Sequence, residues 1–110
     1  MNNEVNYEGV TSANWKSIQG KEVAPNIFER VLWEGIAGRK AVVFEFKAGA
    51  KFPGVDFHQS GAEQIYVISG VFNDGKNDYS QGSFIHNPIG SAHIPQSKKG
   101  CVVLIIFPEG

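Results

Sequence analysis

The chain has 110 residues, with 10 lysines and arginines against 11 aspartates and glutamates and a formal net charge of -1. A chain of this length holds one domain with a single core, which we place at residues 1–110, with an arm or strand at 1–20 and a barrel at 21–110. The balanced charge, with no basic run longer than Lys98-Lys99, argues against nucleic-acid and anionic-membrane surfaces.

Cys101 is the only cysteine, so a secreted disulfide scaffold is excluded. Residues 1–4 have neither a basic start nor an apolar stretch, and no apolar run reaches membrane-spanning length. We therefore expect a soluble, cytoplasmic protein. Cys101 lies in an apolar run, and we interpret it as a buried small hydrophobic residue rather than a redox centre.

Thirteen glycines and five prolines divide the chain into short apolar runs, and no helical pattern extends beyond Trp15 to Gln19. The predicted fold class is all-β. The expected strands are 27–33, 41–46, 55–58, 63–72, 77–79, 83–86, 93–96 and 101–107, and Asn73 to Lys76 favours a hairpin. Strands this short indicate a closed or nearly closed barrel. The run 101–107 is apolar throughout, as in a strand covered on both sides, and it suggests a homodimer.

Asp56 and His58 stand two residues apart, so on an extended strand their side chains leave the same face. Residues 59–62 let the chain reverse before Glu63 opens an apolar run. Facing Cβ atoms on antiparallel neighbours lie about 4.5–5.5 Å apart, which lets Glu63 share a ligand with this pair. Asp56 has an alternative role, since it could instead cap the turn at Pro53-Gly54.

His93 comes from elsewhere in the chain, after a turn cluster at 88–91 that ends one strand and starts another. We predict Asp56, His58, Glu63 and His93 as the ligands of one metal ion. Two imidazoles and two carboxylates suit divalent Fe, Mn, Zn, Ni or Cu, whereas carboxylates alone would indicate Ca or Mg. A charged Glu63 at the start of an apolar strand also needs a partner to offset its desolvation.

Three further residues are candidates for supporting the ligands or lining the pocket, namely His86, Tyr66 and Phe84. His86 shares a strand face with Phe84, and its alternative place is the core or a dimer face. Tyr66 and Phe84 are aromatic residues that fit the core equally well. No catalytic residue is identified, because no acid or base stands out beyond the metal ligands.

These patterns resemble the two motifs of the cupin family, usually written G-x5-H-x-H-x(3,4)-E-x6-G and G-x5-P-x-G-x2-H-x3-N. The resemblance covers residues 49–70 and 82–97, and its matching positions are Glu63, Gly70, Gly82, Pro88, Gly90 and His93. The stretches at 70–75, 82–88 and 90–95 are similar to the cupin domain of ChrR-type anti-sigma factors, a branch that includes acetylacetone-dioxygenase-like enzymes. The resemblance implies an RmlC-like, jelly-roll-like barrel, or double-stranded β-helix, around a metal.

The chain departs from the family pattern at two positions. Asp56 stands where the family usually has its first histidine, and Ser97 stands where the second motif usually ends in asparagine. With Glu63, the Asp56 carboxylate balances a divalent ion to near neutrality. The ChrR-type proteins grip the sigma factor with a separate N-terminal zinc domain, for which residues 1–20 leave no room, so direct sigma-factor binding is not expected.

We therefore expect a small metal-binding cupin that holds one divalent ion, Fe, Zn, Mn or Ni. A small oxygen-bearing organic molecule would bind at its open positions, as in a dioxygenase-like or related metalloenzyme. The alternative is a non-enzymatic binding or sensor module of the ChrR-cupin type. The sequence leaves open whether the protein is an enzyme.

Overall fold

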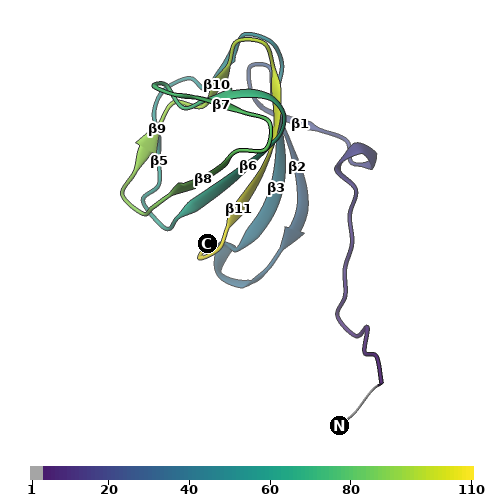
Figure 1. The fold of residues 1–110 in the computed structure, drawn as a ribbon. Helices are drawn as coiled ribbons and strands as arrows, with labels where there is room; N and C mark the ends of the chain where they lie inside the picture. The colour runs from purple at the N-terminus through teal and green to yellow at the C-terminus, as the bar shows by residue number, and fades with distance from the viewer. Residues whose placement is uncertain (1–3) are drawn as a thin grey trace.

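The computed structural model describes residues 4–110, which form one β-barrel with an extended N-terminal arm (Figure 1). The all-β prediction is confirmed. The described residues contain two 3-10 helices, η1 (Trp15–Ser17) and η2 (Ile36–Gly38), and eleven strands: β1 (Lys21–Ala24), β2 (Ile27–Glu34), β3 (Lys40–Phe46), β4 (Ala50–Lys51), β5 (Asp56–Phe57), β6 (Glu63–Asn73), β7 (Asp78–Ser80), β8 (Phe84–Asn87), β9 (Ala92–His93), β10 (Gln96–Ser97) and β11 (Cys101–Phe107).

The longest strand, β6, connects the walls of the barrel. Its first half pairs with β11 on one edge and β8 on the other, and its second half pairs with β7 and β10. The register against β11 shifts at Ile68, which is an extra residue, and the left-handed Gly70 follows. Such a bulge bends a strand and increases its twist, so it lets β6 leave one wall and enter the next. The two-stranded ribbon of β5 and β9 forms a separate side.

Alternation along β6 and β11 builds the core. Ile65 and Val67 of β6 and Val103 of β11 are fully buried, and Ile105 is 4% exposed. β11 lies between β3 and β6. Its residues alternate between buried and half-buried, so the expected cover on both faces is not complete within one copy of the chain. Burial of each such aliphatic side chain stabilises the fold by about 1.5–3 kcal/mol.

The predicted strand at 93–96 is wrong, because the structure divides it into β9 and β10. Pro95 between them has no backbone N–H to donate to a ladder, and the N–H of Ile94 donates to the carbonyl of Asp74 in a loop. β1 and β4 were not predicted. β1 is a polar, exposed edge strand and β4 has two residues, so neither carries an apolar pattern.

The arm leads away from the barrel on the side opposite β5 and β9 (Figure 1). Its apolar side chains Val5, Tyr7 and Val10 are 72%, 74% and 69% exposed. The chain rejoins the body after η1, where Arg30 of β2 donates a 2.8 Å hydrogen bond to the carbonyl of Ile18. The predicted arm begins at residues 1–3, which lie outside the described part. No helix among the described residues is long and apolar enough to cross a membrane.

Candidate metal centre

Four predicted side chains meet at one end of the barrel interior. Asp56 on β5 lies directly opposite His93 on β9, and a backbone hydrogen bond of 2.9 Å from His58 to Ser91 extends this ribbon by one residue. Glu63 is the first residue of β6, whose neighbour there is β8. The expected strand pairing of Glu63 with Asp56 and His58 is therefore wrong, since Glu63 meets them across the barrel interior.

The donor atoms of these four residues surround one point. Nε2 of His93 lies 3.1 Å from Oδ2 of Asp56 and 3.3 Å from Oε1 of Glu63. Nε2 of His58 lies 3.2 Å from the same Glu63 oxygen and 3.5 Å from the same Asp56 oxygen. Bonds of about 2.0–2.2 Å to one metal ion put neighbouring donors roughly 3 to 3.6 Å apart. The spacing therefore fits a single ion.

Two of these atoms are buried without a hydrogen bond, namely Nε2 of His58 and Oε1 of Glu63. A buried polar atom left unpaired costs about 1–3 kcal/mol, and a charged one costs more. A cation between them would satisfy both at once. Imidazole nitrogen and carboxylate oxygen together suit a borderline divalent metal, so the residues fit the ion that the sequence predicts.

Ser91 fixes the tautomer of His58. The Ser91 hydroxyl donates to the carbonyl of Pro88 at 2.6 Å, so its oxygen can only accept from Nδ1 of His58, which lies 2.9 Å away. Because Nδ1 then carries the ring proton, Nε2 presents its lone pair to the cluster. Such contacts behind a ligand typically contribute 10–100-fold to metal affinity.

We expect Ser91→Ala to weaken metal binding by about tenfold, because His58 loses the acceptor that orients it. Competition with a chromophoric chelator would measure the change. Ser91→Thr should restore the affinity, since threonine keeps the hydroxyl. Ser80→Ala, on exposed β7, serves as the matched control. Equal affinities for wild type and Ser91→Ala would contradict this role.

The electrostatics of the metal-free site favour a proton on His93. Burial lowers its pKa, but the hydrogen bond to Asp56 and the negative charges of Glu63 and Asp56 outweigh burial and raise the pKa from 6.5 to about 9. The hydrogen bond to His93 holds the pKa of Asp56 below its usual value, against the opposing effect of burial. Near neutral pH the metal-free site therefore holds a proton on His93, between the carboxylates that would otherwise bind the ion.

Metal affinity should consequently rise with pH, by at most tenfold per unit, and level off near pH 9, because the ion must displace the His93 proton. The metal-free fold should behave in the opposite way. The raised pKa stabilises it fully below about pH 6.5, and this contribution is lost as the pH rises through about 9. Chelator competition from pH 6.5 to 9 would measure the slope. An affinity independent of pH would contradict the assignment.

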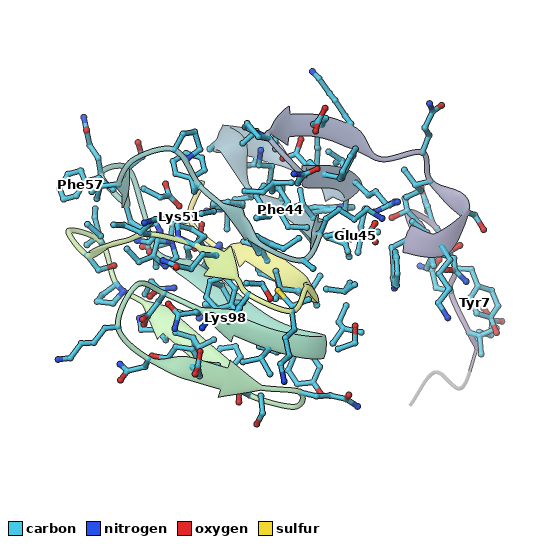
Figure 2. The ribbon with its side chains drawn as sticks, turned by 90° about the horizontal axis from the view of Figure 1, so that it is seen from above. Tyr7, Phe44, Glu45, Lys51, Phe57 and Lys98 are labelled. Carbon is cyan, nitrogen blue, oxygen red and sulfur yellow. The ribbon has the colours of Figure 1, made fainter. Side chains whose placement is uncertain are left out.

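A cavity of about 590 Å³ opens beside the cluster. Asp56, His58 and Glu63 line one part of it, and the Asp56 side chain is 35% exposed. Phe44 lies within the barrel and Phe57 at its outer edge, as Figure 2 shows. This volume is within the usual range for small-molecule sites, so a ligand can reach the position of the ion.

The structure does not bring His86, Tyr66 or Phe84 to the cluster. All three side chains are exposed, on strand positions that alternate with buried residues of β6 and β8. Tyr66 faces Phe84 across the pair, and Nδ1 of His86 lies 3.3 Å from the Gln64 amide. Cys101 is buried, and burial raises its pKa to about 11. The thiol is therefore protonated at neutral pH, in agreement with the sequence analysis.

Three sets of residues near the site escaped sequence analysis. Ser91 lies in the turn at 88–91, and no sequence motif marks it as a partner of a metal ligand. Its position two residues before His93 was the one indication that it lies near the cluster. Glu29 and Lys40 line the cavity from β2 and β3. Charged residues in a strand are normally expected to face solvent, so the sequence does not single them out. The phenylalanines of the cavity wall read as core, because sequence alternation cannot distinguish a barrel core from a barrel pocket.

Comparison with known proteins identifies the family. A family model described as the ChrR Cupin-like domain matches residues 8–108, which is more than half of the chain. No curated protein matches the chain. The matched region contains all four residues of the cluster.

Solved structures share the fold at low sequence identity. Rhodobacter sphaeroides SigE in complex with the anti-sigma ChrR matches with a TM-score of 0.74 and 18% identity over 86% of this chain and 51% of that chain. This chain therefore spans about half the length of that protein. An RmlC-like cupin from Shewanella frigidimarina NCIMB 400 matches with a TM-score of 0.77 and 16% identity over 93% of each chain. The polyketide cyclase RemF from Streptomyces resistomycificus matches with a TM-score of 0.78 and 20% identity over 92% of this chain and 80% of that chain. These likenesses confirm the predicted barrel.

Proposed function

The chain belongs to the ChrR cupin-like family, and we propose that it holds one divalent transition-metal ion through Asp56, His58, Glu63 and His93 and binds a small oxygen-bearing organic molecule beside it. The observation that carries the proposal is the pair of buried, unpaired atoms on His58 and Glu63. They lie 3.2 Å apart, and burial of polar atoms without a hydrogen bond is costly in a metal-free protein.

The opening of the cavity supports a ligand-binding role for the ion. Four protein ligands fill a tetrahedral zinc ion, but they leave two positions open on a six-coordinate ion. Here Asp56 lies at the partly exposed side of the cluster, and the cavity reaches it. A bound divalent ion would polarise a ligand oxygen there. The protein supplies orientation through Ser91 and excludes water with its apolar wall.

The experiment that tests this proposal is elemental analysis of protein purified without chelator or affinity tag. We expect close to one equivalent of Fe, Mn, Ni or Zn in the wild type and less in Asp56→Ala. No metal in the wild type, even after reconstitution, would refute the proposed function. If Asp56→Ala keeps the wild-type metal content, Asp56 is not a ligand. The alternative role, a cap on the turn at Pro53-Gly54, would then be favoured.

A second candidate is a metal-dependent sensor or binding module, favoured by the match to the ChrR cupin. The solved ChrR structure is a complex of that protein with the sigma factor SigE. Oxygen-dependent turnover of a small substrate would support a dioxygenase-like enzyme. Tight zinc with raised thermal stability and no turnover would support the module.

We also propose that the protein forms a homodimer. The outer face of the main sheet exposes Trp33, Tyr66 and Phe84 at 48%, 44% and 60%, and the arm carries three exposed apolar residues that its own barrel does not cover. A second copy that lays its arm on this sheet would bury both surfaces. Sedimentation of the wild type and of Tyr66→Lys would test this.

The division at residue 20, a cytoplasmic location and the absence of sigma-factor binding stay predictions.

A further inference from the structure

The wall of the cavity beside the cluster is unusually rich in aromatic rings. The chain has eight phenylalanines, and five of them line this one cavity: Phe44, Phe46, Phe52, Phe57 and Phe107. Ile27, Val23 and Pro95 complete the apolar lining. Aromatic rings prefer offset-stacked or edge-to-face partners, and each such pair contributes beyond the buried area. The wall therefore favours a flat, aromatic ligand body over an aliphatic chain.

The cavity has a second polar place, separate from the cluster. Among the described residues that line it, the charged side chains outside the cluster are Glu29 of β2 and Lys40 of β3. Their side chains are 21% and 37% exposed, and Nζ of Lys40 lies 4.0 Å from Oε2 of Glu29. Nζ also lies 5.3 Å from the centre of the Phe107 ring. A carboxylate and an ammonium thus share one spot on the wall, whose other polar side chains outside the cluster are Gln59 and Ser60.

The strand register gives the separation of the two polar places. Lys40 pairs with Phe107, and Ile106 pairs with Gln64, so the same register sets Phe107 opposite Glu63. Lys40 is therefore two strand spacings from Glu63. Neighbouring strands lie about 4.8 Å apart, so the two backbones are roughly 10 Å apart. A ligand that contacts both polar places therefore crosses the width of one intervening strand, β11, and a single aromatic ring with a short substituent at each end is of this order of length.

The pair of Glu29 and Lys40 selects a neutral polar group rather than an anion. The two charges cancel locally, and Glu29 would repel a carboxylate brought to Lys40. Their separation of 4.0 Å exceeds a direct charged hydrogen bond of 2.7–2.9 Å. A hydroxyl placed between them can donate to Glu29 and accept from Lys40, which satisfies both.

We propose that the ligand of this cavity is an aromatic compound with two chelating oxygens at the metal end and a hydroxyl group at the opposite end, held between Glu29 and Lys40. This inference rests on the proposed metal site. It adds the substrate class and names two specificity-determining residues that do not touch the ion.

A matched series of O,O-chelating probes tests each part of the ligand. Acetohydroxamate has the chelating group alone, benzohydroxamate adds the ring, and 4-(hydroxymethyl)benzohydroxamate adds the distal hydroxyl. Dissociation constants are measured by calorimetry on the nickel-reconstituted protein, after metal uptake has been verified. We expect each addition to tighten binding by about tenfold, since a hydrogen bond to a charged group or an aromatic pair supplies an effect of that order.

Variants then test the distal residues. In Lys40→Met and Glu29→Gln we expect the affinity ratio of the two aromatic probes to fall to about one. Lys47→Met is the matched control, because Lys47 also pairs with a glutamate of its sheet, Glu45 at 3.1 Å, and does not line the cavity. It should keep the wild-type ratio.

The outcomes separate the two proposals. Failure to take up nickel, iron, manganese or zinc overturns the metal site and this inference with it. Uptake of nickel with equal affinities for acetohydroxamate and benzohydroxamate overturns the aromatic ligand and leaves the metal site standing. A wild-type ratio of one between the aromatic probes, or an unchanged ratio in both Lys40→Met and Glu29→Gln, overturns the distal hydroxyl.

Discussion

Substitution of His93 by alanine should abolish stoichiometric metal binding. His93 is buried at 8% exposure, and its Nε2 contacts both carboxylates of the cluster. Loss of a residue behind a ligand already costs 10–100-fold, so loss of the ligand itself should weaken binding by more than about a hundredfold. Elemental analysis after gel filtration would show the change as an empty protein. Competition with a chelator would give its size.

The same variant should lose the thermal stabilisation that the metal provides. A ligand at 100 times its dissociation constant stabilises the native state by about 2.7 kcal/mol, which raises the Tm of a small domain by roughly 10 °C or more. His86→Ala is the matched control, because His86 is the one histidine of the three that lies outside the cluster, and its side chain is exposed. If His93→Ala keeps the metal and its thermal shift, the assignment of the centre is wrong.

The sequence predicted the cluster of four candidate ligands better than the strand pairing that assembles it. Asp56 and His58 were placed on one face by strand alternation, and His93 by its turn, and the structure brings both to Glu63. The predicted neighbour of β5 was β6, whereas the actual neighbour is β9. Strand pairing between distant segments depends on the closure of the whole barrel, which local patterns do not carry.

The cavity wall was out of reach for a related reason. Phe44 and Phe46 alternate with residues of the opposite face of β3, which is the pattern of any core strand. Phe44 and Phe46 line a pocket only because the side chains of the opposite wall do not fill the space between the walls. Lys40 and Glu29 were not singled out, because a sequence pattern shows which face of a strand a residue takes and not what that face encloses.

Gly70 ends the first cupin motif and Gly82 begins the second, and the structure requires glycine at these two positions for different reasons. Both have a left-handed backbone, with φ of 75° and 92°. A Cβ at Gly70 would lie 2.8 Å from Cα of Cys101 and would also collide with the carbonyl of Gly100. A Cβ at Gly82 would meet nothing within 4 Å. Gly70 thus serves close backbone packing at the bend of β6, and Gly82 serves only its turn.

Gly70→Ala should therefore destabilise the protein by about 3 kcal/mol or more, because backbone atoms cannot move aside as a flexible side chain can. Gly82→Ala should cost only about 1 kcal/mol, the strain of a left-handed alanine. Urea unfolding of both metal-free variants would measure the difference without a contribution from the ion. Equal losses in the two variants would show that backbone conformation alone, and not the contact with β11, makes glycine necessary at the bend of β6.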